Sequence, residues 1–187
     1  PWRFRGAVLE HEFASLGIEG VIALQPIPGS DGVSVEVWVD DLPVQAIMVS
    51  ADLGLQARVR GDGFTADAAF HRIEDSPARK ALPRVIKDAT RALLEDGARK
   101  NPGNSAIQAG LLAWMAKERG LPEAVQAAPI FRQLFGTRVS LQAVKTAAGK
   151  GRIEFVRTSR ARELTGLMTE EAENNPALQS VLLLGPD

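Results

Sequence analysis

The apolar residues in the first part of the chain mostly alternate with polar ones. The clearest stretch is residues 33–39, in which valine occupies every second position and serine, glutamate and tryptophan lie between. Such alternation is typical of a strand with one buried face. By the same criteria and by the turn residues between them, further strands are predicted at residues 21–25, 44–49, 55–60 and 64–73.

Two features of this first part need separate interpretation. The apolar side chains of residues 2–16 fall near helical spacing, which predicts one helix that ends at Gly17. Trp38 falls on the polar face of the strand at residues 33–39. It is either exposed, and then marks an interaction surface, or covered by a neighbouring helix. The prediction for residues 1–76 is a small antiparallel sheet with one helix.

From Pro77 onward the apolar residues follow helical spacing. A stripe at i, i+3 and i+4 intervals predicts a helix whose regular part begins at Pro83 and ends at Gly97. After a turn at residues 101–104, a second helix is predicted to end at Gly120. The apolar stripe of the first helix consists of Leu82, Val85, Ile86, Ala89 and Leu93.

The remaining part of this half also predicts helices. A third helix is expected to begin at residues 121–122, and a fourth, amphipathic one covers residues 128–136. Ser140 then caps a helix that exposes Gln142 and Lys145, and a glycine turn leads from it into a short strand. The predicted fold class is therefore α+β, with a mostly helical C-terminal half.

Charge is segregated along the chain, although the net charge is only −1. Residues 1–76 carry five basic and twelve acidic side chains, residues 77–162 carry seventeen and six, and residues 163–187 carry five acids and no base. These blocks define three predicted regions: an acidic α+β module, a basic helical region and an acidic tail with an apolar end. A basic block is typical of a surface that binds a polyanion. Two alternatives stay open, namely neutralisation by the acidic part of the same chain and binding to an acidic protein.

The segment that contains the helix at Ser140 predicts a helix, a turn, a second helix and a β-wing. Over about residues 124–158 it resembles the winged helix-turn-helix DNA-binding domains of the excisionase-like type. In that pattern a glycine ends the first helix, a Val-Ser pair opens the second, and a Gly-Arg-Ile step begins the wing. The positions that fit are Gly136, Val139, Ser140, Val144, Gly151, Arg152 and Ile153.

This resemblance implies a DNA interface. Gln142 and Lys145 are expected to face base edges, since they lie on the exposed side of the second helix. Other basic side chains of the segment are expected to meet phosphates or to extend that track. These side chains are Arg138, Lys150, Arg152, Arg157, Arg160 and Arg162. The alternative is that the same residues form an ordinary solvated basic surface.

The chain offers few groups for catalysis. It has no cysteine and no tyrosine, and its two histidines, His11 and His71, are far apart in sequence. Because no nucleophile–base pair or set of metal ligands can be identified, no enzyme, metal site or cofactor is predicted. No apolar stretch approaches the ~18 residues of a membrane helix, and no secretion signal opens the chain, so a cytoplasmic location without membrane partners is expected.

The function predicted from the sequence is non-enzymatic DNA binding in a regulatory or DNA-maintenance role, with DNA favoured over RNA. A homodimer is expected, because a single small helix-turn-helix gives low affinity. Residues 1–76 are expected to recognise a protein partner. The alternative is a protein-interaction adaptor, chaperone or structural assembly subunit whose basic half docks on an acidic protein.

Overall fold

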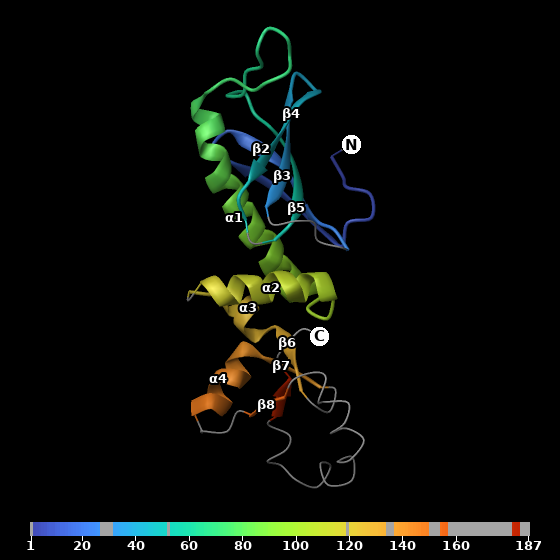
Figure 1. Cartoon of the computed structure of the whole chain (residues 1–187), viewed down its shortest axis with the longest axis vertical. Coiled ribbons are helices and arrows are strands. Elements are labelled where there is room, and N and C mark those ends of the chain that lie inside the picture. Colours follow the sequence, from blue (N-terminus) through green and yellow to red (C-terminus); the bar gives the residue numbers. More distant parts are fainter. Residues whose placement is uncertain are drawn as a thin grey trace. The chain divides into compact units, whose positions relative to one another are not determined.

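The computed structural model (Figure 1) describes residues 2–26, 32–51, 53–118, 120–133, 137–149, 154–156 and 181–183. The chain divides into two compact units, Pro1–Gly120 and Leu121–Asp187. Within the described residues it has a five-stranded mixed sheet, two two-stranded sheets and four helices. The predicted α+β fold class is confirmed at this level. The units divide after Gly120, whereas the charge blocks divide at residues 76 and 162.

The five-stranded sheet belongs to the first unit. Its strands are β1 (Leu9–Ser15), β2 (Ile18–Leu24), β3 (Val33–Val39), β4 (Leu42–Val49) and β5 (Leu55–Arg60). Their spatial order is β1-β2-β5-β3-β4, and neighbours are antiparallel except for β3 and β5. The prediction of a purely antiparallel sheet is therefore wrong. Strands joined by short connections alternate in direction, so β3 and β5 run the same way. Because β5 lies between the two hairpins and next to β3, these two strands pair in parallel.

Both hairpins turn through two residues with positive φ. The angle is 54° at Leu16 and 74° at Gly17 between β1 and β2, and 49° at Asp40 and 60° at Asp41 between β3 and β4. Two-residue turns of this kind match the twist of the strands they join. Because β1, β3 and β5 run in the same direction, both turns and the end of β5 lie at the same end of the sheet.

The helix predicted for residues 2–16 is wrong. Residues Leu9–Ser15 form β1, which pairs along its whole length with β2. The apolar residues of this segment fit period two as well as helical spacing, and so short a window does not separate the two. Pairing with β2 decides for the strand, and Gly17 is a hairpin residue instead of a helix end.

The strand predicted for residues 64–73 is also wrong, because Ala66 and Ile73 form only an isolated bridge. The Asp67 carboxylate closes a turn between them by accepting hydrogen bonds from the backbone N–H of His71 at 2.8 Å and of the next residue at 3.3 Å. These bonds, that of His71 first, hold the pKa of Asp67 below its ordinary value. Side chain-to-backbone bonding favours a turn over a continued strand.

The apolar face of the sheet packs on α1 (Pro77–Lys100), which lies along it in Figure 1. The alternating valines at positions 33, 35 and 37 of β3 are fully buried on this face. The predicted apolar stripe of α1 is confirmed, since all five of its members are buried. Burial of a large aliphatic side chain contributes about 2 kcal/mol, so this interface stabilises the unit.

Helix α1 begins earlier and ends later than predicted. The Ser76 hydroxyl caps it by accepting a hydrogen bond from the backbone N–H of Arg79 at 3.2 Å, so Pro83 lies inside the helix. An interior proline costs about 3 kcal/mol, which the buried stripe offsets. Gly97 does not end the helix. A Cβ there would lie 2.9 Å from Leu9 Cδ2, so this glycine lets β1 approach α1 closely.

The second helix of this unit, α2 (Ser105–Lys117), begins where the sequence predicts. Asn104 is its N-cap, and its side-chain oxygen accepts a hydrogen bond from the backbone N–H of Ala106 at 2.9 Å. Ile107 and Leu111 are completely buried, as expected for its apolar side. This face packs against α1.

The polar face of the sheet is partly covered by the segment that precedes β1. The ring of Trp2 lies 5.5 Å from that of Trp38, and the Arg60 guanidinium lies 5.3 Å from the Trp2 ring. Arg58 stacks in the same way over Phe4 at 4.6 Å. Each cation–π contact at a partly exposed site is worth about 0.5–1 kcal/mol. Trp38 is therefore covered by an extended segment and not by a helix.

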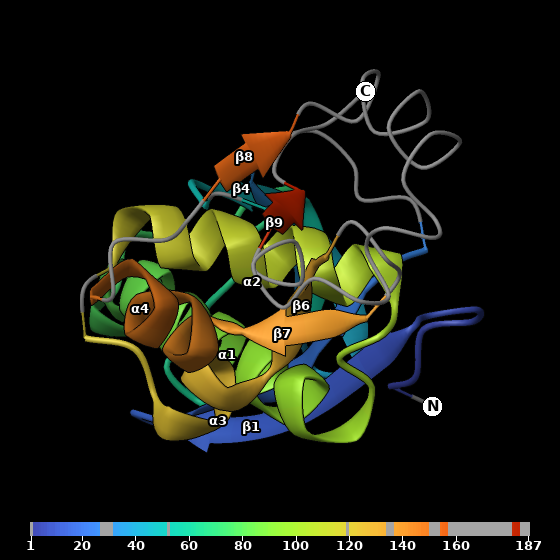
Figure 2. The same ribbon diagram turned by 90° about the horizontal axis from the view of Figure 1, so that it is seen from below.

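The second unit contains α3 (Glu123–Ala127), β6 (Pro129–Arg132), β7 (Arg138–Ser140), α4 (Leu141–Gly149), β8 (Glu154–Val156) and β9 (Val181–Leu183). Strands β6 and β7 form an antiparallel pair, and α4 packs beside it, as Figure 2 shows. The helices predicted after residue 121 and after Ser140 are confirmed as α3 and α4.

The helix predicted for residues 128–136 is wrong in its described part, where β6 stands instead. Its apolar spacing fits either element. Pro129 lacks an N–H group but is tolerated at the first position of a strand in a two-stranded pair. Ile130 is buried and Phe131 pairs with Val139, so tertiary packing selects the strand.

The short strand predicted after the glycine turn is present as β8. It pairs in parallel with β9, which comes from the apolar end of the chain. That apolar end therefore pairs within its own chain. A wing is a hairpin of strands that follow one another, so the expected winged-helix architecture is poorly matched here.

Candidate functional site

The charge segregation along the sequence largely disappears when charges are grouped by structural unit. Pro1–Gly120 carries fourteen basic and sixteen acidic side chains, and Leu121–Asp187 carries eight and seven. The physical reason is that the basic helix α1 packs on the acidic sheet of the same unit. The strong positive charge of residues 77–162 is therefore a property of a sequence interval and not of one folded unit.

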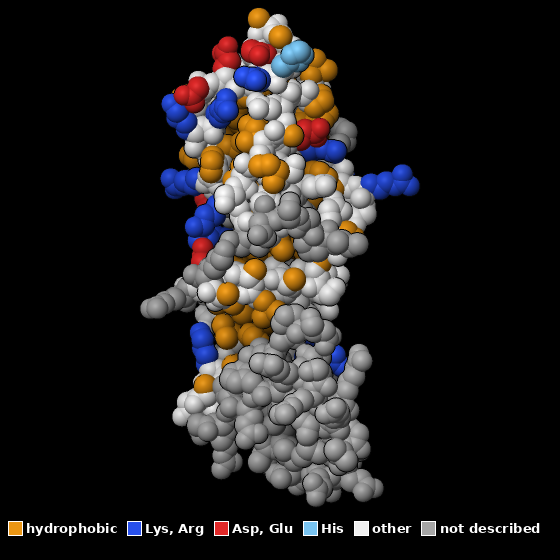
Figure 3. All heavy atoms as spheres, in the orientation of Figure 1, with side chains coloured by type: hydrophobic (Ala, Val, Ile, Leu, Met, Phe, Trp, Pro, Cys, Tyr) orange, Lys and Arg blue, Asp and Glu red, His pale blue; other side chains and the backbone are white. Residues whose placement is uncertain are grey.

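Most basic side chains of α1 are engaged in ion pairs. Figure 3 shows acidic side chains among the basic ones on the face drawn. Exposed pairs of this kind add only about 0–1 kcal/mol of stability each, but they reduce the positive field available to a polyanion. The pairs are Lys80–Asp75, Arg84–Asp88, Lys87–Glu118, Arg91–Glu118, Arg99–Glu95 and Lys100–Asp96.

The predicted DNA-binding residues that the structure describes lie on β7 and α4. Arg138, Gln142 and Lys145 are all exposed, and the Ser140 hydroxyl caps α4 by accepting a backbone hydrogen bond at 3.2 Å. Lys145 Nζ lies 3.4 Å from Gln126 Oε1. Within the described part of the chain, neither Arg138 nor Lys145 forms an ion pair. Their charges are thus available to an anion, unlike most of those on α1.

The structure brings Gln142 and Lys145 to one side of α4, one turn apart, with Arg138 just before the helix. The other predicted contacts lie outside the described residues. These are Lys150, Arg152, Arg157, Arg160 and Arg162. Residues 138–162 together contain seven basic side chains and one acidic one, so the excess of positive charge is dense in this segment.

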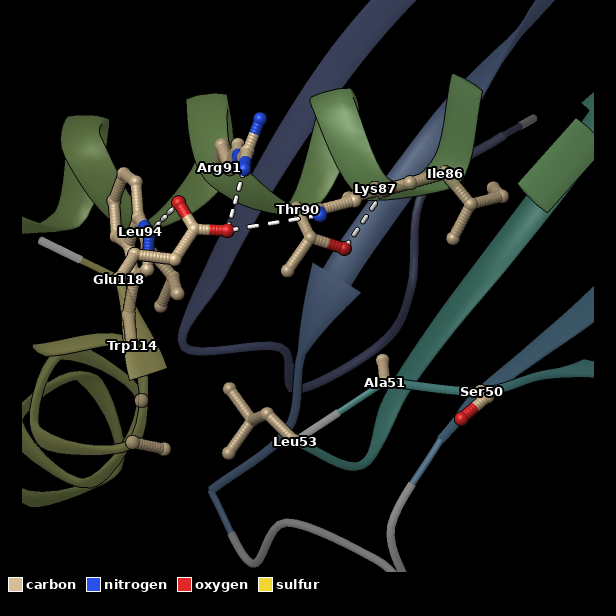
Figure 4. Close-up of a pocket in the computed structure, with 12 residues that line it drawn as sticks. Ser50, Ala51, Leu53, Ile86, Lys87, Thr90, Arg91, Leu94, Trp114 and Glu118 are labelled. Carbon is tan, nitrogen blue, oxygen red and sulfur yellow. Dashed lines mark hydrogen bonds and ion pairs between the residues drawn. The ribbon is translucent and has the colours of Figure 1, made fainter. Parts of the chain in front are cut away.

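The first unit contains a pocket of about 230 Å³ that sequence reasoning missed. It lies between the loop joining β4 to β5, the middle of α1 and the C-terminal half of α2 (Figure 4). Its interior is apolar, because Leu53, Ile86 and Leu94 line it and are at most 8% exposed. Polar groups lie at the rim, chiefly Lys87 and Arg91.

A glycine allows the two helices to form the walls of this pocket. A Cβ on Gly110 would lie 2.7 Å from Leu94 Cδ2 and 2.8 Å from Leu53 Cδ2. Both distances are shorter than a van der Waals contact between carbon atoms. Gly110 of α2 therefore permits a close approach to α1 and to the loop before β5.

Glu118, the C-cap residue of α2, connects the rim groups. Its Oε2 accepts a hydrogen bond from Trp114 Nε1 at 2.9 Å, and its Oε1 binds the Arg91 guanidinium. Lys87 Nζ lies 3.7 Å from the same Oε1. The Trp114 bond first, and then Arg91, hold the pKa of Glu118 below its ordinary value, although partial burial opposes this. The carboxylate is therefore ionised at neutral pH.

The two rim cations keep unused donors. The contact between Lys87 and Glu118 is longer than a hydrogen bond, and the Lys87 side chain is 64% exposed. Arg91 lies 3.9 Å from Asp88 through its second terminal nitrogen, which is also beyond hydrogen-bond distance. An ammonium carries three donors and a guanidinium five, so both groups can bind a further acceptor.

One local signal for this cluster exists in the sequence. Trp114 and Glu118 are four residues apart, a spacing that places them on one side of a helix end. Arg91, however, lies 27 positions before Glu118, and only the packing of α1 on α2 brings the two together. From the sequence alone, Trp114 fits the apolar side of a helix, and Glu118 is one of the six acids among residues 77–162.

Two structural findings concern other classes of protein. In the part of the chain that the structure describes, no group of three or more His, Cys, Asp or Glu side chains is arranged to hold a metal ion. None of the helices described there is long and apolar enough to cross a membrane.

No family model matches the chain, and no curated protein matches it significantly. Function is therefore inferred from the residues and their geometry.

Proposed function

We propose that this chain is a non-enzymatic DNA-binding protein, with a regulatory or DNA-maintenance role, that contacts DNA through residues 138–162. One observation carries this proposal. Arg138 and Lys145 are exposed and form no ion pair with any described residue, at the start of a segment with seven basic side chains and one acidic one. Cations without an acidic partner, such as these two, attract phosphates and release counterions from DNA.

Gln142 and Lys145 are proposed to contact base edges, since they share the exposed side of α4. Arg138 and the basic residues from Lys150 to Arg162 are proposed to contact phosphates, which positions the helix without reading sequence. The first helix of a helix-turn-helix was expected before α4, and β6 lies there instead. The proposal therefore does not rely on that motif. From the family resemblance it keeps only the second helix and the basic segment that follows.

Homodimerisation is part of the proposal. A helix as short as α4, with nine residues, reaches few bases, and two copies on paired half-sites would multiply the affinity. A cytoplasmic location is proposed with it.

The test is fluorescence anisotropy of labelled double-stranded and single-stranded DNA with the full chain at several salt concentrations. Lys145, Lys150 and Arg152 are changed together to alanine. We expect Kd to rise and the slope of log K against log salt to become shallower by about 2, since Lys150 and Arg152 are proposed phosphate contacts and each such contact contributes about 0.9. The steepness of that slope reports the number of phosphate contacts directly.

The matched control changes Lys80, Arg99 and Lys100 to alanine, which removes three cations that already have acidic partners. This variant should keep most of its affinity. Unchanged binding in the first variant would contradict the proposed segment. Equal losses in both variants would contradict it too, because the effect would then follow net charge alone.

The second candidate function is a protein-interaction module, and the sheet end with the two hairpin turns favours it. Leu16 and Leu42 are 61% and 57% exposed there, beside the acidic turn residues Asp40 and Asp41. Exposed apolar side chains rimmed by polar ones are a feature of docking surfaces. A partner recognised through residues 1–76 would use this end.

Size-exclusion chromatography with light scattering distinguishes this candidate from the first. An assembly that forms without DNA, ignores added DNA and dissociates when Leu16 and Leu42 are changed to serine would support an adaptor, chaperone or structural subunit. A chain whose mass changes only when DNA is added would support the first proposal.

A further inference from the structure

We infer that the pocket between the β4–β5 loop, α1 and α2 binds a small monocarboxylic acid with an aromatic or branched apolar body. The apolar body would enter the interior, and the carboxylate would lie at the rim against Lys87 and Arg91. This site lies wholly within Pro1–Gly120 and shares no residue with the proposed DNA contact. The inference therefore goes beyond the proposed function and does not depend on it.

The interior suits an apolar group in both size and chemistry. Leu53, Ile86 and Leu94 form buried walls, and the indole of Trp114 adds a flat aromatic surface. A cavity of roughly 150 Å³ lined by such side chains accommodates a benzene ring. The pocket, with about 230 Å³, has room for one ring and a short chain that ends at the rim. Ligands much larger than this would not be enclosed.

The charges at the rim favour a ligand that carries one negative charge. Among the lining residues that the structure describes, Lys87 and Arg91 are cationic and Glu118 is anionic, which leaves an excess of one positive charge. Asp88, beside Arg91 on α1, is balanced by Arg84. A monoanion would neutralise the excess, whereas a dianion would be repelled by Glu118. A cation would meet the two basic side chains.

The donors at the rim are placed for a carboxylate. Figure 4 shows Lys87 and Arg91 on α1 and Glu118 reaching toward them from the end of α2. Glu118 uses one terminal nitrogen of Arg91 and fixes its position, while the other terminal nitrogen and the Lys87 ammonium keep unused donors. Holding a guanidinium in place before the ligand arrives lowers the entropic cost of binding. The Thr90 hydroxyl donates to the Ile86 carbonyl at 2.8 Å, so it faces a ligand only as an acceptor.

The test is isothermal titration calorimetry of the full chain with 3-phenylpropionate. The comparison ligand is 3-phenylpropanamide, which has the same size and no charge. We expect the acid to bind in the micromolar to millimolar range and at least about tenfold more tightly than the amide, because a hydrogen bond between charged groups is worth about that factor. Equal affinities, or no heat for the acid at ~10 mM, would overturn the inference.

Two variants locate the binding site. Lys87→Ala should weaken the acid about tenfold and leave the amide unchanged, while Lys80→Ala is the matched control. Lys80 is a similarly exposed lysine of α1, at 72% against 64% for Lys87; it has an acidic partner and does not line the pocket. Ala113→Leu fills the interior and should abolish binding of both ligands.

Retained binding in Lys87→Ala, or equal losses in Lys87→Ala and Lys80→Ala, would overturn the assignment of the carboxylate. Retained binding in folded Ala113→Leu protein would overturn the assignment of the interior. Each variant is first compared with the wild type by circular dichroism. If Ala113→Leu does not fold, the comparison of Lys87→Ala with Lys80→Ala tests the binding site by itself. DNA binding by the same samples is measured in parallel, so failure of one proposal is visible separately from failure of the other.

Discussion

Replacing Glu118 by glutamine tests whether this residue joins α1 to α2. Glutamine has the same size and can still accept the Trp114 bond through its amide oxygen, but it loses the charge that binds Arg91 and attracts Lys87. A charge-assisted hydrogen bond is worth about 1.5–3 kcal/mol when shielded. The Arg91 and Glu118 side chains are 40% and 27% exposed, so solvent screening lowers the expected loss to about 1 kcal/mol.

Glu95→Gln is the matched control. The Glu95 side chain is 29% exposed, almost the same as that of Glu118, and it also binds an arginine, Arg99. That pair lies within α1 at i, i+4 spacing and connects no second element. Pairs of this kind contribute about 0.3–0.5 kcal/mol. The difference between the two variants therefore isolates the contact between helices.

The assay is urea unfolding followed by tryptophan fluorescence. All three tryptophans, Trp2, Trp38 and Trp114, lie in Pro1–Gly120, so the signal reports on this unit and not on the second. The free energy of unfolding is extrapolated to water from each curve. In thermal unfolding, a loss of 1 kcal/mol corresponds to a decrease in Tm of about 4 °C for a unit of this size.

The pH dependence gives an independent check with a definite sign. The pKa of Glu118 is lower in the folded chain than its ordinary value of 4.5. Its contribution to stability is therefore fully present above pH 4.5 and is lost as the pH falls through the lowered value. Glu118→Gln should be less stable than the wild type at neutral pH, and the two should converge in acid.

Three results would refute this reasoning. The first is a Glu118→Gln variant as stable as the wild type at neutral pH. The second is a loss no larger than that of Glu95→Gln, because the contact would then be worth no more than a local helical pair. The third is a stability difference that stays constant between about pH 6 and pH 2.5, because the pKa of Glu118 would then be the same in the folded and unfolded chains.

Two further predictions concern positions outside the pocket. Gly97→Ala should destabilise the first unit by about 1–3 kcal/mol despite the better helix propensity of alanine, because its Cβ would lie 2.9 Å from Leu9 and 3.0 Å from Ile107. Gly120→Ala, where a Cβ meets nothing within 4 Å, is the control in the same urea assay, and equal effects would contradict the close-contact explanation. Asp67→Asn should reduce the stability lost in acid. Because the pKa of Asp67 is lowered in the folded chain, its carboxylate stabilises the fold at pH values above its ordinary pKa, and this stabilisation is lost as the pH falls through the lowered pKa. Urea midpoints measured for variant and wild type across the acid range check this, and parallel pH profiles would contradict it.

Local patterns predicted much of the first unit correctly. The strict alternation of β3 leaves one arrangement in which its valines are buried, and the stripe of α1 likewise allows one buried face. The caps Asn104 and Ser140 were also predictable, because a side-chain oxygen satisfies helix N–H groups within its own turn. These features depend only on interactions between residues that are close in sequence.

The candidate sites were predictable only in part. The exposure of Gln142 and Lys145 follows from their place on α4, and the structure confirms it. The pocket was not predictable, since its walls come from three separate segments and Gly110 acts only through the side chains it approaches. The balance of charge also changed, because the lysines and arginines of α1 find acidic partners just before the helix, within it and at the end of α2.

The sequence by itself determined where apolar faces occur, where helices are capped and which segment carries an excess of positive charge. Tertiary structure alone decided whether the ambiguous segments at Leu9–Ser15 and Pro129–Arg132 became strands, because a hydrogen-bonded partner strand is needed to choose between two spacings that both fit. It also decided the parallel pairing of β3 with β5 and the meeting of Arg91 with Glu118. Such contacts join residues far apart in the chain, and their energy exists only once the elements have packed.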